Sequence, residues 1–252
     1  MFSISAKSNF GAGIRALKSQ EKQVRFGSAR ALTAVAVLIK AAEKHEMSDV
    51  FDRPTPFTLN SLFLRAATPG NQMAQVWLKD DDSGNKYAGN YLLPQIEGGN
   101  RLPKRFERAL QAVGVLPAGF VAVPGSAAKL DAYGNMDRGQ IVQILSYFRA
   151  FKTEGFTANI TDKKKAKLAR GTKKKQGYAY FAGRPGDGKL PLGIWQRIHF
   201  ARGSALKPLL IFVDGTLYEK RFDFYYVAER TFEKEWPGAL TREVGNAIAT
   251  AR

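Results

Sequence analysis

The stretch SARALTAVAVLIKAAEK, residues 28–44, has the clearest structural pattern in the chain. Its apolar side chains Leu32, Val35 and Ile39 recur at intervals of three and four residues. This is the period of an α-helix with one buried face, and Ser28 is a residue type that caps the N-terminal ends of helices. We therefore expect an amphipathic helix over 28–44 that packs against the rest of the protein.

A second helical pattern occupies the C-terminal end, residues 223–252. Leu240, Val244 and Ile248 follow one another at four-residue spacing, so we expect one face of this segment to be buried. Pro237 interrupts the segment and should break or kink the helix, because a proline ring removes a backbone hydrogen bond.

Between these helices, several segments have the apolar and polar alternation of β-strands. We expect strands at residues 71–79, 178–181, 193–200 and 208–213, and a turn at residues 80–84. In the middle section, Pro103 and Asp137 each occupy a position that favours the start of a short helix.

These patterns predict an α+β fold, a small and mainly antiparallel sheet flanked by the N- and C-terminal helices, with a helical insertion. We assign residues 1–86 and 176–252 to a core domain. Residues 87–175 form an inserted subdomain that ends in a basic loop.

The charge of the chain is unusual. It has 39 Lys and Arg against 22 Asp and Glu, which gives a net charge of +17 and a pI of about 10.0. Such a surplus attracts nucleic acid, anionic membranes or acidic proteins. No stretch approaches the ~20 uninterrupted apolar residues of a membrane helix, so we expect no membrane partner.

Much of this charge is concentrated in KKKAKLARGTKKK, residues 163–175, which has eight basic residues and no acidic one. A block of like charges favours a solvated, mobile loop, and Gly171 should interrupt any helix there. The same block is a candidate contact for the phosphates of nucleic acid. Its basic residues are Lys163, Lys164, Lys165, Lys167, Arg170, Lys173, Lys174 and Lys175.

The motifs of common enzymes are incomplete. Residues 183–190, GRPGDGKL, match the start of a P-loop, but Leu190 stands where a Ser or Thr would hold magnesium. The chain has no cysteine, and its two histidines, His45 and His199, are far apart in sequence. We therefore predict no enzymatic activity, no cofactor and no metal site.

Five segments resemble those of one protein family. They are FDRPTPFT (51–58), PQIEGGNRLPKRFE (94–107), DAYGNMDRGQIVQIL (131–145), GKLPLGIWQR (188–197) and RTFEKEWPGALTREVGNAIATAR (230–252). Together with the order of helices and strands, they are similar to the minor tail protein Z group and related tail-completion or neck proteins of tailed bacteriophages. The C-terminal segment, a helix with an aromatic residue followed by Pro and a second amphipathic stretch, is the closest local likeness.

The resemblance implies a structural virion protein that forms a homo-oligomeric ring at the head–tail junction or at the head-proximal end of the tail. It implies connector or portal-side and tail-tube proteins as partners. In such a ring, the charge of the basic block predicts contact with DNA phosphates without reading of the base sequence. Assembly in the host bacterial cytoplasm agrees with the absence of cysteine.

Two alternatives stay open. The chain could be a non-sequence-specific nucleic-acid-binding protein outside any virion, or a metal-dependent nuclease.

Overall fold

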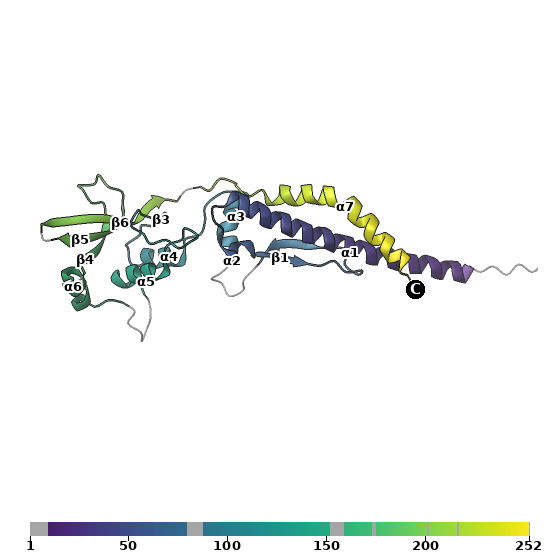
Figure 1. Cartoon of the computed structure of the whole chain (residues 1–252), viewed down its shortest axis with the longest axis horizontal. Coiled ribbons are helices and arrows are strands. Elements are labelled where there is room, and N and C mark those ends of the chain that lie inside the picture. Colours follow the sequence, from purple (N-terminus) through teal and green to yellow (C-terminus); the bar gives the residue numbers. More distant parts are fainter. Residues whose placement is uncertain are drawn as a thin grey trace, which may run out of the picture. The chain divides into compact units, whose positions relative to one another are not determined.

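The computed structural model describes residues 10–79, 88–151, 159–172, 175–200, 202–215 and 217–251. The chain divides into two compact units, unit 1 (Met1–Ile96 with Lys220–Arg252) and unit 2 (Glu97–Glu219). The described residues form helices and two antiparallel sheets, one of two strands and one of four, which confirms the α+β class (Figure 1).

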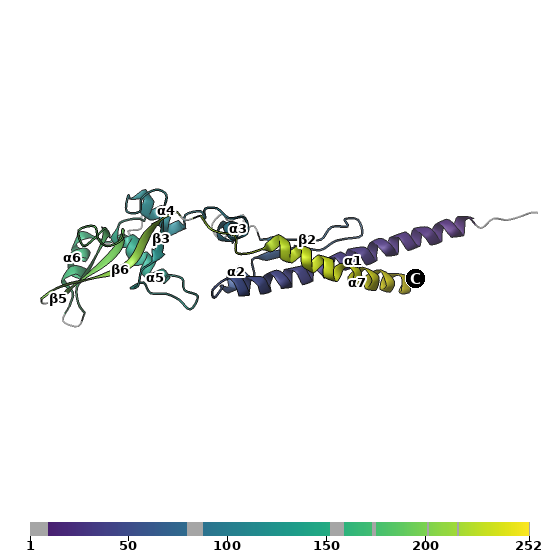
Figure 2. The same ribbon diagram turned by 90° about the horizontal axis from the view of Figure 1, so that it is seen from above.

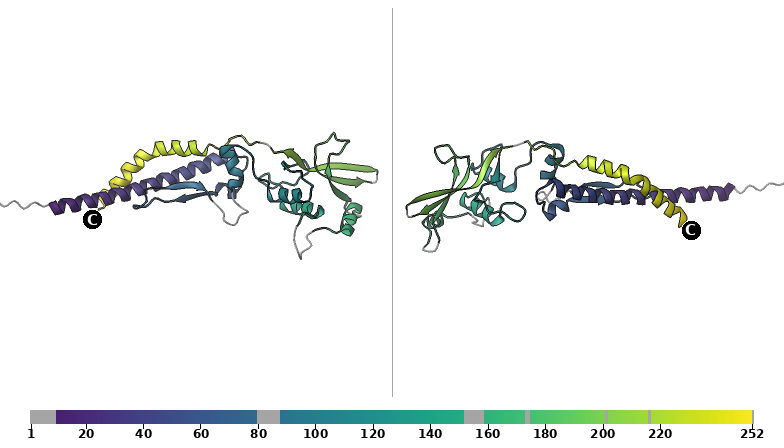
Figure 3. Two further views of the ribbon diagram at one scale, coloured as in Figure 1. Left: turned by 180° about the vertical axis from the view of Figure 1, so that it is seen from behind. Right: turned by 45° about the horizontal axis from the view of Figure 1, so that its top comes forward.

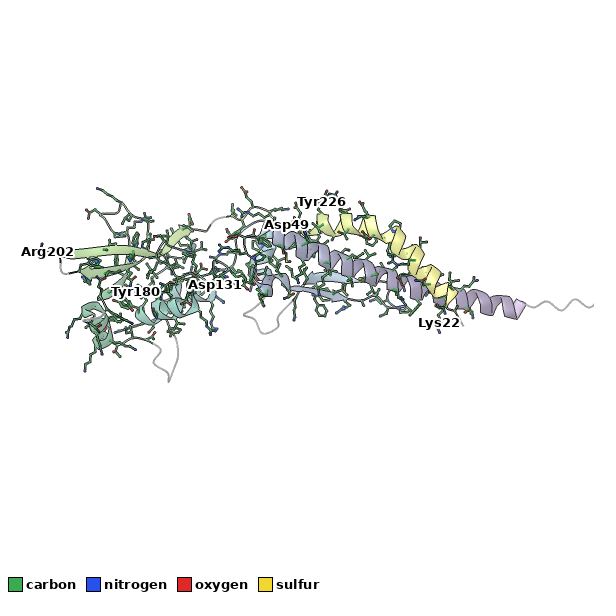
Figure 4. The ribbon with its side chains drawn as sticks, viewed as in Figure 1. Lys22, Asp49, Asp131, Tyr180, Arg202 and Tyr226 are labelled. Atoms are coloured by element: carbon green, nitrogen blue, oxygen red, sulfur yellow. The ribbon has the colours of Figure 1, made fainter. Side chains whose placement is uncertain are left out.

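Two long helices, α1 (Phe10–Val50) and α7 (Phe224–Ala249), pack side by side in unit 1 (Figures 1 and 2). Figure 4 shows Tyr226, near the start of α7, at the end of the pair where Asp49 of α1 lies, so the two helices are antiparallel. The first helix is longer than the sequence pattern predicted. Ser28 consequently lies inside α1 and does not cap it.

Small residues form the seam between these helices. Ala31, Val35 and Ala239 are buried there. A Cβ added to Gly27 would lie 2.6 Å from the Cα of Val244, so only glycine allows the two backbones to approach this closely.

This close approach changes which face of α7 is buried. Ala247 is buried, whereas Ile248, which the sequence placed on the buried face, is 47% exposed. Leu240 does pack against the seam. Pro237 lies inside α7 without ending it, and Figure 3 shows a bend in the middle of this helix, the expected effect of an internal proline.

The remaining elements of unit 1 pack beside α1. Leu62 pairs with Leu78 in the two-stranded sheet, and Met47, Leu92 and Phe222 are fully buried in the adjoining core. The predicted strand at 71–79 is confirmed in its second half, and the predicted turn at 80–84 lies outside the described residues. These elements are α2 (Pro56–Leu59), β1 (Leu62–Arg65), β2 (Gln75–Leu78) and α3 (Gly89–Glu97).

One carboxyl group in unit 1 is fully buried. It belongs to Glu43 of α1, and neither of its carboxylate oxygens has a hydrogen-bond partner among the described residues. Burial, together with the nearby charge of Glu46, raises the pKa of Glu43 to about 8. A carboxyl group in this setting is stable in the protonated, neutral form.

Unit 2 is built on a four-stranded antiparallel sheet with strand order β3-β6-β5-β4. The helices of unit 2 lie on one side of it (Figures 1 and 3), and Leu110, Ile144 and Leu210 are fully buried between helices and sheet. The elements are α4 (Arg105–Ala112), β3 (Phe120–Pro124), α5 (Arg138–Tyr147), α6 (Asp162–Arg170), β4 (Tyr178–Gly183), β5 (Gly193–Phe200) and β6 (Gly203–Asp214).

The division into units differs from the predicted domains, 1–86 with 176–252 and 87–175. Val121 of β3 pairs with Val213 of β6, so the strands after residue 177 complete the sheet of the middle section. Only the chain from Lys220 onward returns to unit 1. An alternating sequence predicts a strand but not its partner, which is why the sequence placed β4–β6 with the terminal helices.

A buried ion pair ties α4 to the sheet. The guanidinium of Arg101 donates two hydrogen bonds to Glu107, of 2.7 and 2.6 Å, and both side chains are almost fully buried. The Glu107 carboxylate also accepts the backbone N–H groups of Lys104 and Ala122. Burial alone would raise the pKa of Glu107, but these hydrogen bonds outweigh it and keep the pKa below its ordinary value.

Candidate nucleic-acid interface

The basic block begins as a helix, which corrects the prediction of a loop. Residues 162–170 form α6. The hydroxyl of Thr161 accepts a hydrogen bond from the backbone N–H of Lys164. Asp162 places a negative charge in the first turn, where it interacts favourably with the helix dipole. Gly171 ends the helix at φ +74°, so the predicted interruption is confirmed but occurs at the C-cap.

Packing holds this helix against the sheet. Leu168 and Ala169 are half-buried on its inner side. Gly177, just before β4, approaches so closely that a Cβ there would lie 2.0 Å from the carbonyl oxygen of Ala169. A Cβ on Gly171 would likewise lie 2.4 Å from the backbone nitrogen of Gly177. The two glycines therefore let the end of α6 dock on the start of β4.

One lysine of the block points inward. The Nζ of Lys165 lies 4.8 Å from the centre of the Tyr147 ring of α5, a cation–π contact. Tyr147 stacks edge-on against Tyr180 of β4, which is buried on the helix side of the sheet (Figure 4). The contact of Lys165 therefore orients α6 and withdraws this lysine from the outer surface.

Four basic side chains form the outward face of α6. Lys163, Lys164, Lys167 and Arg170 are exposed and, at 3.6 residues per turn, project from one side of the helix. Among the described residues, no ion pair involves any of them. Asp162 is paired instead with Arg149. Within the part of the chain that the structure describes, this face thus carries four positive charges and no ion pair.

The rest of the block is less informative. Lys175 is exposed, and its backbone forms an isolated antiparallel bridge with that of Thr172. Lys173 and Lys174 lie outside the described residues. The structure therefore separates the eight predicted contacts into five exposed residues, one inward residue and two that it does not describe.

The charge surplus belongs mainly to unit 2. Residues 97–219 contain 21 Lys and Arg against 9 Asp and Glu, a net charge of +12, whereas the other residues contain 18 against 13, a net charge of +5. The α6 face therefore lies on the more basic unit, where the field of the whole unit adds to its attraction for polyanions.

The other candidate motifs do not form sites in the described residues. Residues 183–190 connect two antiparallel strands, β4 and β5, so no helix follows them as phosphate binding by a P-loop requires. His45 is exposed and contacts Asp49 of its own helix, and His199 is also exposed. Within the described ranges of the chain, no group of side chains could hold a metal ion.

A cavity of about 340 Å³ lies in unit 2, beside the start of β3 and the end of β6. Arg101, Asp214 and Tyr218 are among the residues that line it. The guanidinium of Arg101 is already bound to both oxygens of Glu107, so it is not available to an anionic ligand.

The sequence did not identify Tyr147, Gly171 or Gly177 as determinants of the basic site. The sequence predicts that Gly171 interrupts the helix, but not that it contacts Gly177. The requirement for glycine at position 177 depends on a close approach of two backbones and has no local sequence signal. Tyr147 has only one weak signal, its position at the end of the predicted helix after Asp137.

None of the helices in the described part of the chain is long and apolar enough to cross a membrane. No protein-family model, curated protein or solved structure shows significant similarity to this chain.

Proposed function

We propose that this chain is a structural protein of a tailed-bacteriophage virion, forming a ring at the head–tail junction or at the head-proximal end of the tail. The proposal starts from the resemblance of its five sequence segments to tail-completion and neck proteins. Its partners would be further copies of itself, connector or portal-side proteins and tail-tube proteins. It would have no catalytic role.

The observation that carries the proposal is the separation of two kinds of surface. Unit 2 presents the basic face of α6, suited to a polyanion. In unit 1, Val37 and Leu38 of α1 are 53% and 42% exposed on the same helix that buries Val35. We assign these two apolar side chains to contacts between subunits, so that one unit would serve assembly and the other the DNA passage.

The test is the fate of virions that lack the protein. In a host that carries the encoding phage, deletion of the gene should yield DNA-filled heads and free tails that do not join, seen by negative-stain microscopy. Mass spectrometry of purified wild-type particles should detect the chain. Normal infectious particles without the protein, or its absence from wild-type particles, would contradict the proposal.

The second candidate is a nucleic-acid-binding protein outside any virion, and the uncompensated charge of α6 also favours it. The two candidates differ in where the protein is found. The second requires the chain on cellular nucleic acid and absent from particles. A nuclease would be detected by magnesium-dependent nicking of plasmid DNA by the pure protein.

A further inference from the structure

We infer that the outward face of α6 is a preformed site for the phosphate backbone of double-stranded DNA. Bound DNA would stabilise this helix by neutralising the positive charges of the face. The site consists of Lys163, Lys164, Lys167 and Arg170, whereas Lys165 positions the helix. The inference deepens one part of the proposed function, the contact with DNA, and rests on the proposed function only for that part.

The first argument is the cost of the face to the free protein. Lys163 and Lys167 are four residues apart, and Lys164 and Lys167 are three residues apart. Like charges at these spacings destabilise a helix by a few tenths of a kcal/mol per pair. A helix of nine residues is also too short to be stable by itself. The repulsion is tolerated because the Thr161 cap and the packing of Leu168 hold the helix.

The second argument concerns the type of partner. Protein interfaces have an apolar centre, but the exposed positions of α6 are occupied only by Lys, Arg, Asp162 and Ala166. Single-stranded nucleic acid is bound by exposed aromatic rings, but Tyr147 and Tyr180 pack against each other in the core. A surface of cations without aromatic rings or large apolar side chains fits the backbone of a duplex.

The third argument concerns the N-terminal end of α6. Helix N-termini commonly bind phosphate, but here Asp162 occupies the first turn and is paired with Arg149. The Asp162 carboxylate therefore already occupies the place at which a phosphate would interact with the helix N-terminus. Contact should therefore be made by the side chains along the helix, which read no base sequence.

The experiment measures binding of the whole protein to a fluorescent 30-bp duplex by anisotropy over a range of salt concentrations. In the face variant, Lys163, Lys164, Lys167 and Arg170 are changed to Gln. Four lost phosphate contacts should reduce the log–log salt slope by about 3.6, and the wild-type protein should lose about 150-fold more affinity than the variant between 50 and 200 mM salt.

A matched control separates the local face from net charge. Its four substitutions to Gln also remove four positive charges, but from exposed positions of unit 1, at Lys18, Lys22, Lys44 and Lys234. We expect this variant to keep the wild-type slope. An equal loss in both variants would mean that only net charge matters, and an unchanged slope in the face variant would mean that α6 is not the contact. Either result overturns the inference.

Hydrogen exchange tests the effect on the helix. Saturating duplex should slow exchange of the α6 amides in the wild-type protein and leave them unchanged in the face variant. A third variant, Lys165→Gln, should keep the salt slope and speed α6 exchange in the free protein. If poly-glutamate protects α6 and the duplex does not, the partner is an acidic protein and the inference is wrong. Each of these results is independent of whether the protein occurs in virions.

Discussion

The buried Glu43 predicts a pH-dependent loss of stability in unit 1. Its carboxyl group is fully buried and has no hydrogen-bond partner in the described part of the chain, and burial raises its pKa from 4.5 to about 8. In the unfolded chain the group titrates at its ordinary value. The folded state therefore holds a proton that the unfolded state releases as the pH rises from about 4.5 to 8.

The sign and size follow from proton linkage. Because the pKa of Glu43 is raised in the folded state, the contribution of the bound proton to folding stability is complete below pH 4.5. This contribution declines between pH 4.5 and 8 and is lost above about pH 8. At about 1.4 kcal/mol per pH unit, the full shift corresponds to roughly 5 kcal/mol. Local relaxation lets water reach an ionised carboxylate, so we expect about 2–4 kcal/mol to be measured.

The assay compares the wild-type protein with Glu43→Gln at pH 5.0 and 8.5. Hydrogen exchange of the α1 amides around Val35 and Met47 reports the opening free energy of unit 1 alone. The wild-type protein should lose 2–4 kcal/mol more than the variant between the two pH values, since the variant has no proton to lose at this position.

Two further variants make the result specific. Glu46→Gln removes the second cause of the raised Glu43 pKa, the nearby negative charge, and should reduce the loss of stability between pH 5.0 and 8.5 in part. Glu233→Gln, on the exposed surface of α7, should leave the effect unchanged. Parallel pH profiles of the wild-type protein and Glu43→Gln, or a Glu43 carboxyl carbon that titrates near pH 4.5 by NMR, would refute the reasoning.

Three other predictions concern unit 2. Glu107→Gln leaves the buried Arg101 without its counter-charge and should cost about 3–5 kcal/mol in denaturant unfolding of unit 2; a loss below 1 kcal/mol would contradict the buried pair. Gly177→Ala should clash with the α6 backbone and speed exchange of the α6 amides, whereas Gly245→Ala, in the open on α7, should stabilise by up to about 1 kcal/mol. Asp137→Ala should remove the α5 cap and cost about 1 kcal/mol, measured in the same unfolding experiment.

The sequence predicted those features that depend on nearby residues. The cap at Asp137 is confirmed, because its side chain accepts the N–H of Gln140 three residues on. The strand at Gly193–Phe200 is confirmed at both ends. In each case the determining interaction, a capping hydrogen bond or an alternation of faces, lies within a single element.

Features that depend on distant residues could not be predicted. Besides its neighbour β5, β6 pairs with β3, about 90 residues earlier in the chain, and alternation is the same for any partner. The buried face of α7 is set by Gly27 on the opposite helix, so that Ala247 and not Ile248 is buried. Charge density alone favoured a loop at residues 163–175, whereas contacts with Tyr147 and Gly177 stabilise a helix.

The difference between a loop and a helix matters for how the basic block would bind. Ordering a flexible segment costs about 1–2 kcal/mol per residue in backbone entropy, and a loop would meet that cost at the moment of binding. In α6, folding of unit 2 has already fixed the backbone through the Thr161 cap and the close contact at Gly177. Gly177→Ala should therefore weaken duplex binding without removing a single charge. Such a result would separate the geometry of the face from its charge, which substitutions of the lysines alone cannot do.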